Sequence, residues 1–222
     1  MDEQYFLKER QQMVEDQFVK RDIYNNRVLE AMLATPRHRF IPREYHHLAY
    51  ADCPLPIGQN QTISQPYIVA LMTQMLGLLG KEIVLEIGTG SGYQAAVLSL
   101  LAREVHTVER YAELAAKAAE VLGILGITNV YIHVGDGSLG WLENAPYQGI
   151  IATAAAPRLP PPLLEQLDDG GRLVLPVGSR GGQYLERWIR QGEDFSQEKT
   201  VPVAFVPMLG EFGWADDAWE WA

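Results

Sequence analysis

The segment VLEIGTGSGYQAA, from Val84 to Ala96, places three glycines within five positions, where a strand is expected to give way to a helix. Gly88, Gly90 and Gly92 can adopt a positive φ, and because they lack a Cβ they let a ligand approach the main chain. The amides at the start of the following helix would then face that ligand. The pattern indicates a ligand-binding turn; a purely structural turn is the alternative for the glycines taken alone.

Acidic residues follow at the ends of the next two expected strands. Glu109 stands 23 positions after Glu86, a distance at which a carboxylate can accept hydrogen bonds from ribose hydroxyls. Asp136, between two glycines, can accept from the exocyclic amino group of adenine. The alternatives are a solvated carboxylate at a helix start for Glu109 and an ordinary turn residue for Asp136. Taken together, the three strand ends predict one nucleoside site.

The spacing of the glycines separates two kinds of nucleoside enzyme. The dinucleotide fingerprint is G-x-G-x-x-G, whereas this chain has G-x-G-x-G, with Tyr93 directly after the third glycine. An NAD-dependent enzyme is therefore a disfavoured alternative.

Strand and helix patterns alternate from Glu82 onwards, which predicts right-handed βαβ units and a mostly parallel sheet. We expect an α/β fold with a doubly wound, Rossmann-like sheet that carries helices on both faces. The expected strands lie in 82–88, 104–110, 129–136, 147–156 and the second half of 161–178, and an antiparallel edge pair lies in 183–209. The segments LVLPVG and VAFVPM are expected to be edge-like and open to strand addition.

The chain is expected to form a single domain over residues 1–222. Its parts are an N-terminal helical cap with a loop region (1–80), a nucleoside-binding core (81–180), C-terminal strands (181–210) and a poorly ordered tail (211–222). Residues 3–34 are expected to be helical, residues 43–64 to be loop and turn, and a helix to begin at Pro66.

Composition limits the possible partners. The net charge of −10 opposes binding to phosphate backbones, so nucleic acid is not expected as a partner. No run of about 18 apolar residues and no secretory signal occurs, and Cys53 is the only cysteine. We expect a cytoplasmic monomer without membrane contact. The neighbouring His46 and His47 lack a third ligand at metal spacing, so no metal site is expected, and His106 is expected to be a satisfied core residue.

The strand-end motifs LEIGTGSGY, VER and GDG resemble those of class I S-adenosylmethionine-dependent methyltransferases. Upstream of them, LPIGQNQTISQPYIVA resembles the signature of the protein-L-isoaspartate O-methyltransferase family. PRHRFIP before it and FVPM near the end match the same family in order, so that the resemblance spans roughly residues 14–209. Gln148 and Gly149 depart from the Asp-Ala that the family more often shows.

The resemblance implies roles for particular residues. It implies S-adenosyl-L-methionine as the cofactor, with S-adenosyl-L-homocysteine as its product, and Ser64 as the active-site serine. Cofactor-binding positions are Thr62, Ile63, Gln65, Glu86, Gly88, Thr89, Gly90, Ser91, Glu109, Arg110, Asp136 and Gly137. Substrate-binding positions are Ser64, Pro176, Val177, Gly178, Phe205, Val206 and Pro207.

The implied reaction moves a methyl group to the α-carboxylate of L-isoaspartyl residues in damaged proteins and peptides, which then return to aspartate through a succinimide. Because a carboxylate is already ionised at neutral pH, no general base is needed. From the residues alone, Ser64 before Gln65-Pro66 favours a helix N-cap, and the resemblance reverses that preference. The alternatives for the whole chain are a methyltransferase for one modified peptide or a small molecule, and a non-catalytic binder that keeps the pocket.

Overall fold

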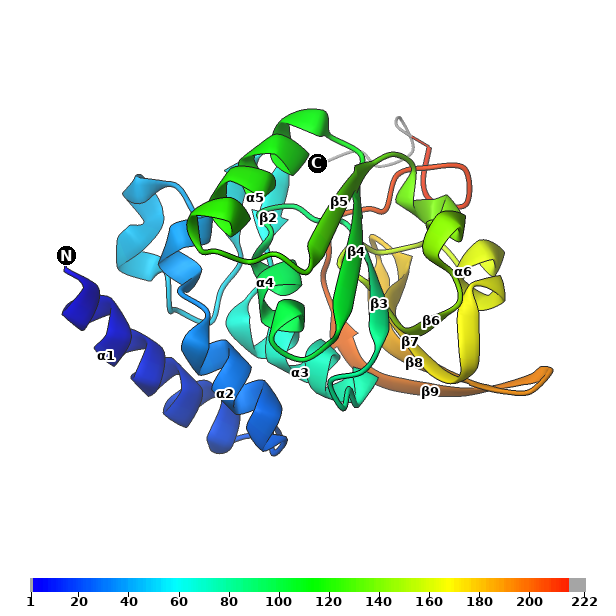
Figure 1. The fold of residues 1–222 in the computed structure, drawn as a ribbon, viewed down its shortest axis with the longest axis horizontal. Coiled ribbons are helices and arrows are strands. Elements are labelled where there is room, and N and C mark those ends of the chain that lie inside the picture. The colour runs from blue at the N-terminus through cyan, green and yellow to red at the C-terminus, as the bar shows by residue number, and fades with distance from the viewer. Residues whose placement is uncertain (1, 216–222) are drawn as a thin grey trace.

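The computed structural model describes residues 2–215, without the side chains of Lys199 and Thr200. Two sheets are present: a small β1–β2 hairpin and a seven-stranded sheet in the order β5-β4-β3-β6-β7-β8-β9 (Figure 1). The first five strands of this order pair in parallel, and β8 and β9 extend the sheet in antiparallel fashion. The strands are β1 (Leu55–Gly58), β2 (Gln61–Ile63), β3 (Ile83–Ile87), β4 (Glu104–Glu109), β5 (Val130–Val134), β6 (Tyr147–Ala152), β7 (Leu167–Ser179), β8 (Gly182–Gln191) and β9 (Asp194–Val203).

Helices cover both faces of the large sheet, as the alternating pattern predicted. One hydrophobic cluster joins the N-terminal helices, α3, α4 and α5 to one sheet face, and a second joins α6 to the other face. The helices are α1 (Glu3–Met13), α2 (Asn26–Ala34), α3 (Pro66–Leu76), α4 (Tyr93–Ser99), α5 (Ala112–Ile124) and α6 (Pro161–Glu165), with a π-helix at Val14–Val19 and 3₁₀ turns at Arg37–Phe40, Arg43–Leu48, Gly137–Leu139 and Leu142–Asn144.

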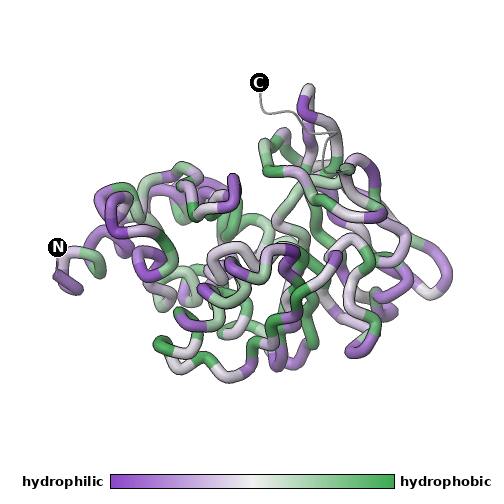
Figure 2. Tube along the Cα trace, turned by 90° about the horizontal axis from the view of Figure 1, so that it is seen from above, coloured by the Kyte–Doolittle hydropathy of each residue, from purple (hydrophilic) through white to green (hydrophobic). Residues whose placement is uncertain are grey.

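The central strands have apolar side chains on both faces. Val84 belongs to the first cluster and its neighbour Leu85 to the second, and both are fully buried. Figure 2 shows the apolar residues gathered in the interior and the polar ones on the outer loops. Strands buried on both sides are expected in a parallel sheet with helices on each face. The Rossmann-like fold expected from the sequence is therefore confirmed.

Three local predictions need correction. Residues 3–34 are helical over 3–19 and 26–34 but not between, because Asn25 starts a new helix by accepting hydrogen bonds from the amides of Arg27 and Val28. Residues 43–64 include the β1–β2 hairpin, whose turn contains Gln59 and Asn60 at positive φ. The expected poor order of the tail does not hold for 211–215, which the structure describes; residues 216–222 lie outside the described part.

The LVLPVG segment is not an edge. It lies in β7, which pairs with β6 on one side and with β8 on the other. Its main-chain groups are used by the sheet, so this segment is closed to strand addition. The outer edge on this side is formed by β9.

The buried core contributes most of the stability of the fold that carries the site. Leu173 on β7 is fully buried, so Leu173→Ala should lower the free energy of unfolding by about 2–5 kcal/mol. Leu142 is 77% exposed, so Leu142→Ala should change it by less than about 0.5 kcal/mol. Urea denaturation of both variants measures the difference, and equal effects would contradict the described packing.

Candidate active site

The glycine-rich turn after β3 has the conformation that its sequence predicted. Gly88 has a φ of 92°, Gly90 of 53° and Gly92 of 84°. A Cβ on Gly88 would lie 2.5 Å from Thr153 Oγ1, and this hydroxyl donates a 2.6 Å hydrogen bond to the Gly88 carbonyl. The turn is thus held tightly against the end of β6, and glycine is required there both by φ and by space.

Glu109, at the end of β4, holds the same turn from the other side. Its Oε2 accepts a 2.7 Å hydrogen bond from the Gly90 amide, and its Oε1 accepts one of 2.9 Å from the Tyr111 amide. The residue is only 5% exposed, yet it lines a pocket. Since each carboxylate oxygen can accept two hydrogen bonds, capacity for ribose hydroxyls remains.

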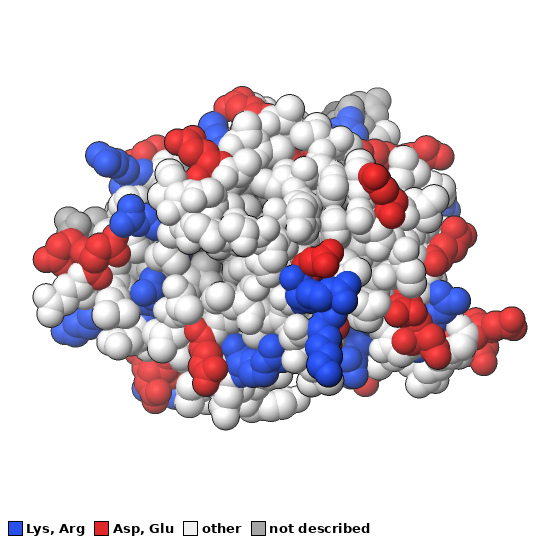
Figure 3. All heavy atoms as spheres, in the orientation of Figure 1, with Lys and Arg blue, Asp and Glu red and all other residues white. Residues whose placement is uncertain are grey.

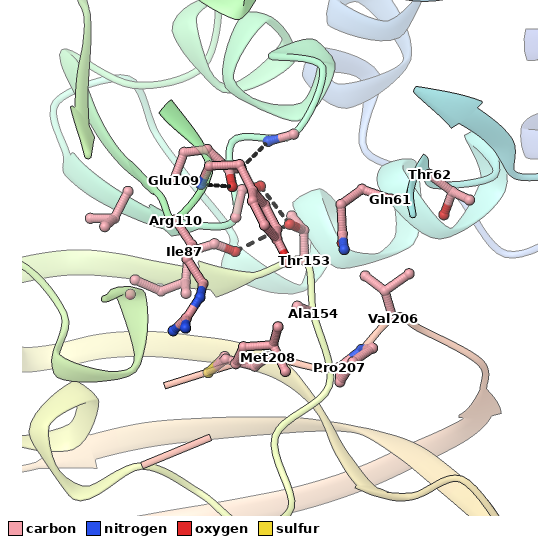
Figure 4. Close-up of a pocket in the computed structure, with 16 residues that line it drawn as sticks. Gln61, Thr62, Ile87, Glu109, Arg110, Thr153, Ala154, Val206, Pro207 and Met208 are labelled. Carbon is pink, nitrogen blue, oxygen red and sulfur yellow. Dashed lines mark hydrogen bonds between the residues drawn. The ribbon is translucent and has the colours of Figure 1, made fainter. Parts of the chain in front are cut away.

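The pocket beside Glu109 is open to solvent and is lined by residues from β2, from the ends of β3 and β4, and from the segment after β9. Figure 4 shows Gln61 and Thr62 of β2 on one side and Pro207 and Met208 on another. The carboxyl ends of β3 and β4 form its base. A Cβ on Gly137 would lie 2.5 Å from Ile87 Cγ2, so Gly137 also allows close packing at this wall.

Asp136, predicted to bind adenine, uses its carboxylate for the protein itself. Oδ1 accepts hydrogen bonds from the Ser138 amide (2.9 Å) and hydroxyl (2.7 Å), and Oδ2 accepts one from the Glu211 amide (2.8 Å). It is not among the residues that line the pocket, whereas the neighbouring Gly137 is. Asp136 therefore anchors the segment after β9, and its contact with adenine stays a prediction.

A second, adjoining pocket contains Glu86, a fully buried carboxylate. Thr107 lies on the neighbouring strand, but its hydroxyl is 2.7 Å from that of Thr89, and both oxygens of Glu86 lack a hydrogen-bond partner in the described part of the chain. Burial, with a smaller contribution from the nearby negative charge of Glu109, raises the pKa of Glu86 to about 8. A carboxylate of this kind fits a cationic group of a ligand.

Ser64 lies where this second pocket meets a larger groove. Its hydroxyl has no hydrogen bond within the described residues, and it does not cap α3. The N-cap residue of α3 is Gln65, and Asp52 Oδ1 instead accepts the Tyr67 amide at 3.2 Å. The N-cap explanation for Ser64 is therefore wrong, and its hydroxyl is available to a ligand.

The groove begins at Ser64 and runs between the start of α3 and the end of β9. Phe205 and Val206 line it, as the resemblance implied, and Pro207 lines the Glu109 pocket. Gln65 lies in this groove and in neither of the two adjoining pockets.

The other predicted positions divide into two groups. Those that line the Glu109 pocket or the Glu86 pocket are Thr62, Ile63, Glu86, Gly88, Thr89, Gly90, Ser91, Glu109, Arg110 and Gly137. Pro176, Val177 and Gly178 are outside all three, because β7 pairs there with β8 and with the segment around Ala156. Substrate contact by these three residues stays a prediction that no feature of the site supports.

Two contributors to the site were missed from the sequence. Thr153, directly after β6, lines both pockets and the groove. Its place at a fourth strand end was the available signal. Arg21 lines the groove from the segment before α2, and nothing local in the sequence marks it.

Two residues outside the predicted positions have structural roles. The Gln148 side chain accepts a hydrogen bond from the Ile83 amide at 2.8 Å and donates one to Asp168 at 2.7 Å, so that the departure at this position tightens the sheet. His106 is buried, as expected of a core residue, but only partly satisfied: its Nδ1 lies 3.1 Å from His133 Nε2, and its Nε2 has no hydrogen-bond partner among the described residues. Within the described chain, no three His, Cys, Asp or Glu side chains group together as metal ligands.

The fold and the pocket at the ends of β3 and β4 define a Rossmann-like methyltransferase. The chain belongs to the protein-L-isoaspartate(D-aspartate) O-methyltransferase family, whose model matches residues 8–212. Protein-L-isoaspartate O-methyltransferase of Dictyoglomus thermophilum is 56% identical over 194 residues, 87% of this chain and 88% of the relative. That of Geobacter metallireducens is 52% identical over 94% of this chain and 97% of its own length.

Solved structures of similar proteins have the same fold. A protein-L-isoaspartate O-methyltransferase superposes with a TM-score of 0.84 at 28% identity and covers 92% of this chain and 67% of that one. A Plasmodium falciparum protein in complex with S-adenosyl-L-homocysteine gives a TM-score of 0.78 at 22% identity, over 90% and 98% of the two chains, and supports the fold. Among residues 2–215, no helix has the length and apolar character needed to cross a membrane.

The buried carboxyl of Glu86 should make stability depend on pH. Its pKa is about 8 in the folded chain against an ordinary 4.5, so between these values the folded state keeps a proton that the unfolded state has lost. Its contribution to stability therefore falls as pH rises through this window. Glu86→Gln removes the titration, so the ligand-free variant should gain on the wild type by up to about 1.4 kcal/mol per pH unit.

Chemical denaturation of both proteins at pH 5, 6.5 and 8 measures this difference. A difference that stays constant from pH 5 to pH 8 would contradict the buried, unpartnered state of Glu86.

Proposed function

We propose that this chain transfers the methyl group of S-adenosyl-L-methionine to the α-carboxylate of L-isoaspartyl residues in damaged proteins and peptides. The observation that carries the proposal is the hydroxyl of Ser64, which is unpartnered and lies where the pocket of Glu86 opens into the groove. An acceptor in the groove and a donor in the pocket would meet at this residue.

The residues at the two pockets suit the cofactor. Glu109 would accept from the ribose hydroxyls, and the main chain of Gly88 and Gly90 lines the same pocket. The unpartnered carboxylate of Glu86 would meet the cationic part. When bound, S-adenosyl-L-methionine supplies an electrophilic methyl group on a sulfonium centre.

The acceptor needs orientation more than activation. An α-carboxylate, with an ordinary pKa near 3.5, is ionised at neutral pH and needs no base. The Ser64 hydroxyl would donate one hydrogen bond to it and so aim the other oxygen at the methyl carbon, and such orientation lowers barriers by up to about 7–11 kcal/mol. The methyl ester formed is attacked by the next backbone nitrogen, which closes a succinimide and releases methanol, and water then opens the ring to aspartate or isoaspartate.

The segment after β9 suits an extended peptide. The Gln183 side chain accepts a 2.7 Å hydrogen bond from the Phe205 amide and donates one of 3.1 Å to the Phe205 carbonyl. In an extended segment, the main-chain groups of the adjacent Ala204 point to the opposite side. Ala204 lines the groove, where a substrate strand would pair with its main chain, whereas the Val206 carbonyl already accepts a 2.8 Å hydrogen bond from the Ala155 amide.

We further propose that the chain acts as a cytoplasmic monomer on protein substrates and does not bind nucleic acid. On the face shown in Figure 3, basic side chains are interspersed with acidic ones. The net charge of −10 supports the same view, because it repels phosphate backbones.

Matched peptides test the proposal. With labelled methyl donor, transfer is expected to several unrelated isoaspartyl peptides and not to their aspartyl counterparts. Ser64→Ala should slow transfer by about 10²-fold, an effect of the size found for removal of one orienting hydrogen bond, and should leave the affinity for S-adenosyl-L-homocysteine within twofold. Equal labelling of aspartyl and isoaspartyl peptides would exclude the repair function.

The role of Glu109 is tested by binding alone. Glu109→Gln loses the negative charge that attracts ribose hydroxyls, so the dissociation constant for S-adenosyl-L-homocysteine should rise by about 10-fold or more, since hydrogen bonds to charged groups contribute about 1.5–3 kcal/mol. Titration calorimetry measures it, with Glu113→Gln on the exposed start of α5 as the control. An unchanged constant for Glu109→Gln would contradict the assigned role.

A further inference from the structure

The wall of the groove that faces the end of β9 carries one charged side chain. Among the described residues that line the groove, Arg21 alone is charged, and the others are apolar or neutral. Arg21 lies between the π-helical turn and α2, far in sequence from every motif of the site. Its side chain is 43% exposed, so a ligand in the groove can reach it.

Two contacts fix the guanidinium group of Arg21, and two more hold its partners in place. The guanidinium carbon lies 3.2 Å from the centroid of the Tyr67 ring. Nη1 donates a 3.0 Å hydrogen bond to Asp52 Oδ2, while Asp52 Oδ1 accepts the Tyr67 amide. The Tyr67 hydroxyl in turn donates a 2.6 Å hydrogen bond to Asp22. The Tyr67 ring, the carboxylates of Asp52 and Asp22 and the Arg21 guanidinium therefore form one connected network of contacts at the start of α3.

The charges around Arg21 decide which ligand group it suits. Asp52 forms an ion pair with the guanidinium, and Asp22 accepts the hydroxyl of the stacked Tyr67, so the positive charge of Arg21 is already balanced and a substrate carboxylate gains little there. A guanidinium has five N–H donors, and the hydrogen bond to Asp52 uses one of them. Donors that are already oriented, with their charge neutralised, suit a neutral acceptor such as a peptide carbonyl.

We propose that Arg21 positions the substrate by donating hydrogen bonds to a main-chain carbonyl next to the isoaspartyl residue. Main-chain recognition is independent of the flanking side chains, which a repair enzyme for many damaged sequences requires. The inference rests on the proposed function and adds to it a contact on the wall of the groove opposite Ala204 and Val206.

Three isoaspartyl peptides test this inference, with neutral, acidic or basic residues on both sides of the isoaspartyl residue. Arg21→Met keeps the length and apolar body of the side chain but removes every donor, so KM should rise about tenfold for all three peptides while kcat stays within twofold. Arg21→Lys, which keeps the charge and a single donor group, should give a smaller rise. Arg103→Met, at the opposite ends of the strands, is the matched control and should leave KM unchanged.

The results for the Arg21 variants test the inference about Arg21, and the result for the wild type tests the proposed function. An unchanged KM in Arg21→Met overturns the inference, and so does a rise confined to the acidic peptide, which would make Arg21 a reader of substrate charge. The affinity for S-adenosyl-L-homocysteine and the thermal midpoint show whether Arg21→Met is folded. If it is not folded, the KM of Arg21→Lys, which should also rise for all three peptides, tests the inference instead. Lack of transfer to any isoaspartyl peptide by the wild type would overturn the proposed function itself.

Discussion

The carboxylate of Glu109 joins the two strand ends on which the site is built. By accepting the amides of Gly90 and Tyr111, it fixes the turn after β3 against the turn after β4. Thr153 makes the corresponding connection to β6. These hydrogen bonds hold the turns after β3, β4 and β6 together, so the walls of the pocket have a defined shape in the ligand-free protein.

The site also brings two acidic side chains together in a buried place. Glu86 and Glu109 lie on adjacent strands, and burial, together with the charge of Glu109, raises the cost of ionising Glu86. A cationic ligand removes this cost, whereas a neutral one removes less of it. The same electrostatics therefore favour a sulfonium donor over its neutral product, which suits an enzyme that must release product to turn over.

The sequence predicted those parts of the site that depend on local geometry. Gly88 and Glu109 could be placed because strand ends and positive-φ turns leave a local signature. Pro176 was misplaced in an edge-like segment, because the pairing of β7 with β8 depends on the whole topology. Asp136 was expected to bind adenine. Its hydrogen bond with the Glu211 amide joins residues 75 positions apart, so no local sequence pattern could predict it.

Arg21 also could not be assigned to the site from the sequence. Its contacts with Asp52 and Tyr67 depend on the packing of α3 against the N-terminal segment. In the sequence, an arginine after a helical stretch is indistinguishable from an ordinary surface residue. Ser64 could be assigned only by resemblance, because its residue type favours an N-cap. The structure separated the two explanations by placing Gln65 at the cap and Asp52 at the amide of Tyr67.

A crystal structure of the ternary complex with S-adenosyl-L-homocysteine and an isoaspartyl peptide tests the account most directly. The ribose hydroxyls are expected within hydrogen-bond distance of Glu109, and the peptide α-carboxylate on the Ser64 hydroxyl, with its free oxygen facing the sulfur. A nucleoside bound away from the ends of β3 and β4, or a peptide carboxylate that does not reach Ser64, would contradict it.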